Sequence, residues 1–339
     1  MSKIYDALQK VEKKRVIRPQ VEVKEEKESQ TEIHTLPKVT GSVFDQRPVS
    51  FFQPGQFYHL TKEPFHVTPD PEFLFLSPSH KQALGSIIYG AKNKKGFIVI
   101  TGEVGVGKTT ILRSYLAGVV NQKTKIIYIF NSNVTFKNLL KTIYKELGFI
   151  TKTDDSTEML NGLYQILMKE YKEGNIVLLI VDEAQNMPMQ TLENLRMLSN
   201  LETSKDKLLQ IVLIGQCEFE QMLNQYSLRQ LKQRIAIRFT IIPLTKKESI
   251  AYIKHRLDKA SANNSQVFTK EALKAIVKEA KGIPRRLNIL CDNALITGFR
   301  YQKRPVNLKI AKEVIGGFNG KEKSSFLKPP YGTDNFGKT

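Results

Sequence analysis

The sequence has few of the residues that build covalent cross-links or metal centres. Its 339 residues include two cysteines, five histidines and no tryptophan. Cys217 and Cys291 belong to no CxxC pair, and the sequence has no HExxH motif. Two separated cysteines in a chain of this length are typical of a reducing compartment, so we interpret both as small buried thiols and not as a disulfide. The sequence therefore predicts no zinc or other transition-metal site.

Long apolar runs are also missing from the sequence. No run approaches the roughly 20 residues needed to cross a bilayer, and residues 1–30 lack the apolar core of a secretory leader. We therefore expect no integral membrane segment. Apolar residues still make up 41% of the chain, which is typical of a globular protein, and the length favours about two domains.

Acidic residues are scarce relative to basic ones, and the imbalance is uneven along the chain. The net charge of +19 divides into +2 for residues 1–50, +5 for residues 51–242 and +12 for residues 243–339. The last segment has twenty basic residues against eight acidic ones. Such a positive region could meet nucleic acid, anionic lipid or an acidic partner protein. A lysine-rich solvated surface is the equally weighted alternative.

A glycine-rich loop stands between an apolar run and a helix-compatible stretch. The run from Phe97 to Ile100 predicts a buried parallel strand, and the octet GEVGVGKT that follows fits the phosphate-binding pattern GxxxxGK(S/T). Glycines let consecutive N–H groups point at a phosphate, and the next helix adds its partial positive charge. We predict a nucleoside triphosphate site, because a chance glycine-rich turn explains neither flank. The expected binding residues are Gly102, Gly105, Val106, Gly107, Lys108, Thr109 and Thr110.

Two carboxylates supply the second half of the expected chemistry. Lys108 would reach the β- and γ-phosphates, and the Thr109 hydroxyl would bind Mg²⁺. The run from Ile176 to Val181 is wholly apolar, as in a strand covered on both faces, and it delivers Asp182 and Glu183 to the carboxyl edge of the sheet. There Asp182 would hold Mg²⁺ through water, and Glu183 would orient and deprotonate the attacking water.

Three further polar residues are candidates for catalysis. Gln216 ends LLQIVLIGQ (208–216), which predicts another buried strand, and there it could contact the γ-phosphate or its water, although strand-end glutamines are commonly structural. Arg234 precedes a final strand and could complete a neighbouring subunit's site as a finger. A structural salt bridge is the alternative for Arg234, and Arg229 is the next candidate finger. Arg285 follows Pro284 at the start of a long helix.

The chain divides into four predicted segments. Residues 1–50 comprise an amphipathic helix over residues 2–15 and a disordered linker, an arrangement that suggests docking onto a partner or packing on the chain's own domain. Residues 51–243 form an α/β nucleotide-binding core. Residues 244–318 form a small helical lid, and residues 319–339 a disordered tail.

Together these motifs resemble the AAA+ ATPases, and among them the general secretion pathway protein A family. The similarity covers roughly residues 51–318 and rests on PFHVTPDPEFLFLSPSHKQAL, GFIVITGEVGVGKTT, LLIVDEAQNM, LRQLKQRI and GIPRRLNILCDNAL. It implies a five-stranded parallel sheet with the phosphate loop on a central strand, followed by the helical lid. It also implies ATP, Mg²⁺, a homo-oligomer, sensor roles for Gln216 and Arg285, and a finger role for Arg234. Relatives usually have proline where this sequence has Cys217.

The resemblance also implies a place for the protein in the cell. Longer relatives continue into a membrane span and a periplasmic peptidoglycan-binding part, and this sequence ends before either. It is more similar to the short members found beside exopolysaccharide and exosortase-type sorting systems. Its opening, MSKIYDALQKVEKK, also resembles the start of polysaccharide-associated tyrosine autokinases.

We therefore expect an ATP-hydrolysing motor or switch that serves a bacterial secretion or polysaccharide-export system through a protein partner bound by residues 2–15. The expected location is the cytoplasm, with attachment to the inner membrane through that partner as a further hypothesis. The alternative is a DNA-associated regulator that resembles the transposition ATPases and uses the basic region on phosphates. Against it, only about 20 residues follow the lid, and the basic region lacks interleaved aromatics. A small-molecule kinase is disfavoured because nothing supplies an acceptor pocket.

Overall fold

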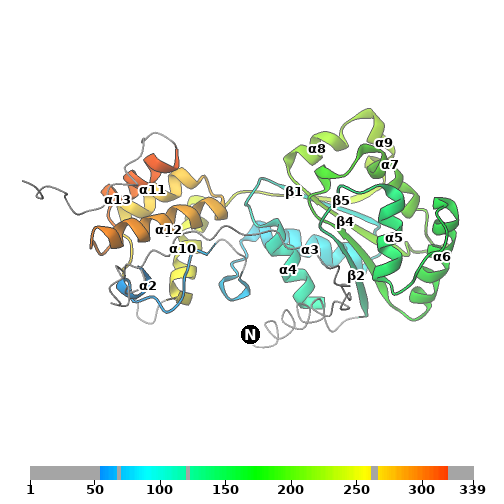
Figure 1. The fold of residues 1–339 in the computed structure, drawn as a ribbon, viewed down its shortest axis with the longest axis horizontal. Coiled ribbons are helices and arrows are strands. Elements are labelled where there is room, and N and C mark those ends of the chain that lie inside the picture. The colour runs from blue at the N-terminus through cyan, green and yellow to red at the C-terminus, as the bar shows by residue number, and fades with distance from the viewer. Residues whose placement is uncertain (1–53, 67–69, 120–122, 261–265, 320–339) are drawn as a thin grey trace, which may run out of the picture.

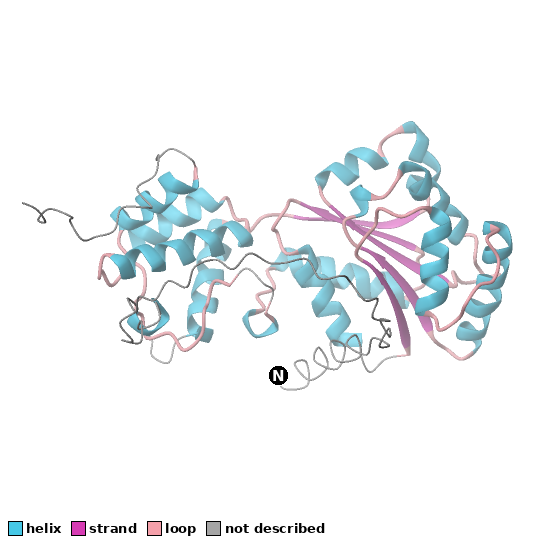
Figure 2. Cartoon of the chain, viewed as in Figure 1, coloured by secondary structure: helices cyan, strands magenta, loops and turns pink. Residues whose placement is uncertain are grey.

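The computed structural model describes residues 54–66, 70–119, 123–260 and 266–319 (Figure 1). The predicted helix at residues 2–15, the linker and nearly all of the predicted tail lie outside the described residues. In the part that is described, a unit of strands and helices and an all-helical unit lie side by side along the long axis of the molecule (Figures 1 and 2). No helix among the described residues is long and apolar enough to cross a membrane.

Five parallel strands form a single sheet, which confirms the fold class expected from the sequence. Their order across the sheet is β2-β3-β4-β1-β5. The strand that leads into the glycine-rich loop, β1, has β4 and β5 as neighbours, and β3 pairs with β4. The bounds are β1 Phe97–Gly102, β2 Thr124–Ile129, β3 Ile176–Val181, β4 Leu209–Gly215 and β5 Ile235–Ile241.

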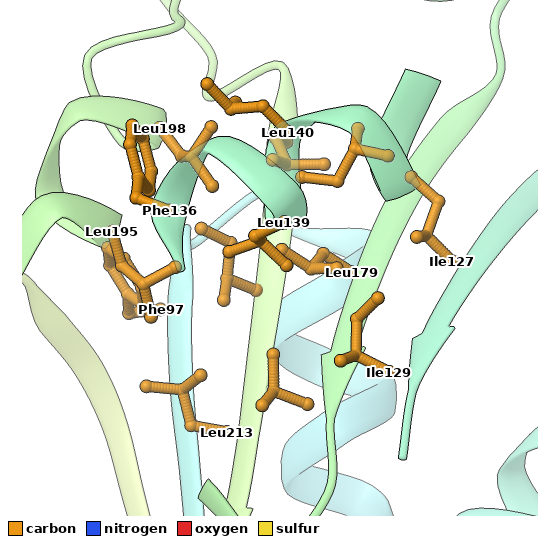
Figure 3. Packing of buried hydrophobic residues seen from close by; sticks show 14 of the residues in the cluster. Phe97, Ile127, Ile129, Phe136, Leu139, Leu140, Leu179, Leu195, Leu198 and Leu213 are labelled. Carbon is orange, nitrogen blue, oxygen red and sulfur yellow. The ribbon is translucent and has the colours of Figure 1, made fainter. Parts of the chain in front are cut away.

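Helices cover both faces of the sheet, which is why β3 is apolar at every position and β1 and β4 at most positions. One face packs under α5, α6 and α7, and its strand residues alternate with those that pack under α3 and α4. Figure 3 shows side chains of α5 and α7 directed at β1, β3 and β4. These helices and the short ones near β5 are α3 Pro78–Lys92, α4 Lys108–Val119, α5 Phe136–Glu146, α6 Ser156–Lys172, α7 Met189–Leu198, α8 Cys217–Leu223 and α9 Arg229–Gln233.

The helical unit, called the lid below, has its own hydrophobic core. It comprises α10 Lys246–Ala260, α11 Lys270–Ala280, α12 Pro284–Arg300 and α13 Leu308–Phe318. Its buried residues include Leu287, Leu290 and Ala294 on α12, which packs against α13, α11 and α10. The lid therefore buries its apolar faces without help from the sheet.

Residues 54–66 and 70–73, called the strap below, pack with the lid although they precede the core in sequence. The strap contains α2 Pro54–Phe57 and the single turn Pro71–Phe73, and its Tyr58 and Phe65 are buried in the lid's cluster. The Thr61 N–H donates to the Ala260 carbonyl at 2.7 Å. This packing differs from the predicted division, which assigned residues 51–243 to the core. Aromatic content predicts burial, but it does not say in which of two cores the residues are buried.

The two cysteines differ in environment. Both are free, as expected, and Cys291 is fully buried in the lid, where burial raises the pKa of its thiol. Cys217, in contrast, is exposed at the first position of α8, so the interpretation of both as buried thiols is wrong for Cys217. The reason is its place after the end of β4, where the chain leaves the covered part of the sheet.

Candidate functional site

Most of the predicted nucleotide-binding residues line one cavity between the core and the lid, whereas Gly102, Val106 and Asp182 lie outside its lining. The cavity has a volume of about 400 Å³ and lies where β1, β3 and β4 end. Residues from the loop after β1, from the ends of β3 and β4, and from α12 face it together. The predicted residues that line it are Gly105, Gly107, Lys108, Thr109, Thr110, Glu183, Gln216 and Arg285.

The glycine-rich loop has a backbone that only glycine accommodates at two positions. Gly105 and Gly107 have φ angles of +81° and +102°, in the region that side chains with a Cβ rarely adopt. A Cβ at Gly105 would lie 2.8 Å from the Arg285 Cβ, and one at Gly107 would lie 2.8 Å from the His80 Nε2. The glycines therefore serve both the loop conformation and the close approach of its neighbours.

Lys108 extends back over this loop and is held by its carbonyls. Its Nζ donates to the Gly102 carbonyl at 2.8 Å and to the Glu103 carbonyl at 3.0 Å. Burial lowers the pKa of Lys108, and the carboxylates of Glu183 and Asp182 oppose that change. The ammonium is therefore placed at the centre of the loop, where a bound phosphate would meet it.

His80 supports the loop from behind and was not identified from the sequence. Its Nε2 lies 2.7 Å from the Val106 carbonyl, and its Nδ1 lies 2.7 Å from the Ser77 hydroxyl. The carbonyl can only accept, so Nε2 carries a proton, and Nδ1 accepts from the hydroxyl. Burial lowers the pKa of His80, which favours this neutral form. Ser77 also caps α3, so the contact between His80 and the loop ties the start of this helix to the phosphate loop.

Asp182 is fixed at the end of β3 by two hydrogen bonds. The Tyr128 hydroxyl donates to its Oδ2 at 2.9 Å, and the Glu183 N–H donates to its Oδ1 at 2.9 Å. Burial raises the pKa of Asp182, and these two hydrogen bonds oppose the rise. Tyr128, on the neighbouring strand β2, was not identified from the sequence because cross-strand register brings it there.

Thr109 and Asp182 offer the oxygen atoms that suit Mg²⁺. Asp182 is almost fully buried, is held by the Tyr128 hydroxyl and acts on the pKa of Lys108 in the phosphate loop, so these residues fit the ion. Among the described residues no group of three or more His, Cys, Asp and Glu side chains could hold a metal ion. Mg²⁺ at this site would therefore take its remaining ligands from phosphate oxygens and water.

Glu183 follows in an uncommon backbone conformation. Its φ and ψ angles of 50° and 46° are left-handed, and the Ser132 hydroxyl fixes this turn by donating to its carbonyl at 2.7 Å. The Glu183 Oε2 accepts from the Gln216 Nε2 at 3.0 Å. The structure therefore brings together the residues that follow β3 and β4. A further donor to Oε2, Gln185, was not identified from the sequence.

The two predicted arginines differ in where they lie. Arg285 lines the cavity. Its backbone N–H donates to the Gly105 carbonyl at 3.3 Å, and this hydrogen bond ties α12 to the loop. Arg234 does not line this cavity. Its Nη1 donates to the Ser199 hydroxyl at 2.7 Å and to the Asn200 Oδ1 at 2.8 Å. A finger role for Arg234 stays a prediction about a neighbouring subunit.

Comparison with known proteins identifies the fold and a relative. The sequence matches the AAA domain family over residues 91–223. It is also 41% identical, over 72% of its length, to general secretion pathway protein A of Aeromonas hydrophila. This chain is an AAA+ protein related to general secretion pathway protein A. It spans 44% of that relative's length. A shorter match, 33% identical over 25% of the chain and 22% of the relative, is an uncharacterised HTH-type transcriptional regulator of Methanocaldococcus jannaschii.

Solved structures of similar fold have low sequence identity to this AAA+ protein. The Aeropyrum pernix ORC2 protein with ADPNP and ADP aligns with a TM-score of 0.55 at 16% identity, over 75% of this chain and 71% of that one. Drosophila ORC bound to DNA aligns with a TM-score of 0.57 at 17% identity, over 92% of this chain and 74% of that one. At such identities the likeness shows the fold alone.

In this AAA+ protein, a polar cluster of the lid forms the far wall of the cavity. Arg256 is buried, and it donates from Nε to the Pro64 carbonyl and from Nη1 to the Tyr252 hydroxyl at 2.8 Å. The Tyr252 hydroxyl donates to the Asn288 Oδ1 at 2.9 Å. The guanidinium also lies 5.0 Å from the centre of the Phe73 ring. The cluster therefore joins the strap to the lid where both face the cavity, and sequence spacing gave no sign of it.

Proposed function

We propose that this AAA+ protein binds ATP with Mg²⁺, hydrolyses it, and serves as a motor or switch in a bacterial secretion or polysaccharide-export system. The observation that carries the hydrolysis is that Lys108 and Glu183 line one cavity, with Asp182 bonded to the Glu183 N–H and acting on the pKa of Lys108. The similarity to general secretion pathway protein A supports a role in secretion. The choice of polysaccharide export rests on the resemblance in sequence alone.

Each of these residues has a separate role in the proposed reaction. Backbone N–H groups of the glycine-rich loop and the Lys108 ammonium bind the phosphates. Mg²⁺, held by Thr109 and through water by Asp182, would neutralise phosphate charge. Glu183 orients a water molecule and accepts its proton while the oxygen attacks the γ-phosphorus and the bond to the β–γ bridging oxygen breaks. ADP leaves with the bridging oxygen, and phosphate is the second product.

A homo-oligomer in which Arg234 reaches a neighbour's γ-phosphate is part of the proposal. Arg234 is exposed at the end of α9, beside the edge strand β5, so a second subunit can approach it. Its hydrogen bonds to Ser199 and Asn200 hold the guanidinium within one chain. Action in trans therefore requires that the phosphate replaces these neutral acceptors.

A DNA-associated regulator is the second candidate function. The lid, residues 246–318, has sixteen basic residues against six acidic ones, which suits contact with phosphates. If DNA is the ligand, duplex should stimulate ATP hydrolysis, and affinity should fall log-linearly with salt. Absence of both effects at about 50 mM salt, where phosphate contacts are strongest, removes this candidate.

The test of the secretion role is a purification from native cells. The Glu183→Gln protein, loaded with ATP and Mg²⁺, should retain a component of an envelope secretion or polysaccharide-export system. The same protein without residues 2–15 should lose it if that segment binds the partner. Recovery of the component at the cytoplasmic face of the inner membrane would support the proposed location. Retention of DNA-bound proteins alone would contradict the secretion role.

A further inference from the structure

The side chain of Gln185 joins the two strand ends that form the candidate hydrolytic site. Its Nε2 donates to the Glu183 Oε2, and its Oε1 accepts from the Gln216 N–H at 3.0 Å. The Gln216 Nε2 donates to the same Glu183 oxygen at 3.0 Å. These three hydrogen bonds join Glu183, Gln185 and Gln216 in a closed ring. The ring links the turn after β3 to the residue that follows β4.

The backbone around Gln185 explains how it reaches both partners. The left-handed conformation of Glu183 turns the chain sharply into the single helical turn Ala184–Asn186. The Asn186 N–H donates to the Glu183 carbonyl at 2.9 Å, and the Ser132 hydroxyl donates to the same oxygen. A non-glycine residue in this conformation persists only where its surroundings hold it. The turn is thus fixed independently of the Gln185 side chain.

The chemistry of the ring requires an amide at position 185. Glu183 offers only acceptor atoms when ionised, and the Gln216 N–H offers only a donor. An amide meets both because it has a donor end and an acceptor end. A carboxylate at position 185 could accept from Gln216 but would repel Glu183, and a leucine could serve neither.

We propose that Gln185 is a positioning residue that fixes the Glu183 carboxylate relative to the end of β4 and the first turn of α8. It acts through Glu183, which is the group that touches the attacking water, and it does not contact the nucleotide itself. The inference rests on the proposed ATPase function. A misplaced catalytic group costs on the order of 10²-fold in rate, so loss of the amide should reduce kcat while leaving nucleotide affinity unchanged.

The kinetic test compares two substitutions at Gln185 with matched changes at an exposed glutamine. Gln185→Leu and Gln185→Glu should lower kcat by about 10- to 100-fold, with KM and the dissociation constant for ATP within about twofold. Gln190 lies on α7, is exposed and bonds only to Asn194 at 3.4 Å among its described contacts. Gln190→Leu and Gln190→Glu should leave kcat within about twofold. Equal kcat values for the Gln185 variants and the wild type would overturn the inference.

A second readout does not depend on turnover. Hydrogen exchange of the Gln216 N–H in the nucleotide-free protein should be faster in Gln185→Leu than in the wild type, because its acceptor is gone. In Gln185→Glu a carboxylate oxygen replaces that acceptor, so exchange should stay slow although kcat falls. General loss of structure would instead accelerate exchange in both variants, and that result would overturn a positioning role.

A double substitution shows whether Gln185 acts through Glu183. In a Glu183→Gln background, Gln185→Leu should lower the remaining turnover by less than about twofold, because the group it positions is already replaced. If the double variant instead loses kcat by the product of the two single-variant reductions, the inference is overturned. If the wild type binds ATP but releases no phosphate, both the proposed function and the role in turnover fail. If the wild type hydrolyses ATP and Gln185→Leu does so equally fast, only the inference fails.

Discussion

The core and the lid border the same cavity but position their polar groups in different ways. Lys108 begins α4 after the short loop that follows β1, and Glu183 lies two residues after β3, so short segments next to the sheet set the places of both. Arg256, in contrast, is held through a carbonyl of the strap, almost 200 residues away in sequence. We therefore expect changes in the core site to alter the reaction alone, and changes in the lid cluster to alter packing as well.

The largest expected effect tests whether the core site is complete within one chain. Arg234→Ala should reduce ATP hydrolysis by about 10³- to 10⁵-fold, the usual loss on removal of an arginine finger. Mixed with the Glu183→Gln protein, it should recover part of the rate, because an intact Glu183 can then face an intact Arg234. Recovery should rise with protein concentration. No recovery in an assembly that exchanges subunits would leave Arg234 with its structural hydrogen bonds only.

The next largest effect separates binding from chemistry inside the core. Glu183→Gln should keep nucleotide affinity and lose about 10²- to 10⁴-fold in kcat, the worth of a positioned base. Lys108→Ala should lose nucleotide binding, because it leaves a phosphate charge uncompensated. Titration calorimetry and phosphate release measure the two properties separately. Wild-type hydrolysis by Glu183→Gln would show that Glu183 is not the base.

Replacement of Arg256 in the lid should change ATP hydrolysis less than the core substitutions do, and should lower the free energy of unfolding more. Arg256→Met keeps the volume of the side chain but removes its hydrogen bonds, and a bond to a charged group contributes about 1.5–3 kcal/mol. The free energy of unfolding should fall by about 2–4 kcal/mol in urea denaturation. Lys254→Met, on the exposed side of the same helix, is the matched control and should change little. If Arg256→Met and Lys254→Met have the same free energy of unfolding, the hydrogen bonds of Arg256 do not stabilise the lid, and the contrast with the core site fails.

The smallest expected effect concerns the pH dependence contributed by His80. Because burial lowers the pKa of His80, the unfolded chain binds more protons than the folded chain once the pH falls below the ordinary value of about 6.5. The contribution of His80 to the free energy of unfolding is therefore present above that pH and is lost as the pH falls through the lower folded value. His80→Gln should show a shallower loss of stability below pH 6.5 than the wild type. Parallel curves would contradict the assignment of a neutral His80.

Agreement between sequence and structure is best where the chemistry is local in the chain. The five strands, the glycine-rich loop and the carboxylates after β3 are encoded by short patterns. The hydrogen bond from Gln216 to Glu183 was not predicted, and a contact of Gln216 with the γ-phosphate stays a prediction. Arg285 lies in the first turn of α12, as predicted, whereas its backbone hydrogen bond to Gly105 was not predicted. The packing of the strap with the lid and the exposure of Cys217 were not predicted, because both depend on which surface covers a segment.

The sequence by itself determined the phosphate loop, the order of polar groups after the strands and the helical nature of the lid. These features follow from periodicity and from residues within a few positions of one another. Only the tertiary structure decided that His80 supports the loop, that Tyr128 holds Asp182, that Gln185 links Glu183 to β4 and that Arg256 ties the strap to the lid. Each of these depends on hydrogen bonds whose direction and reach are set by folding, which a pattern of residue types does not contain.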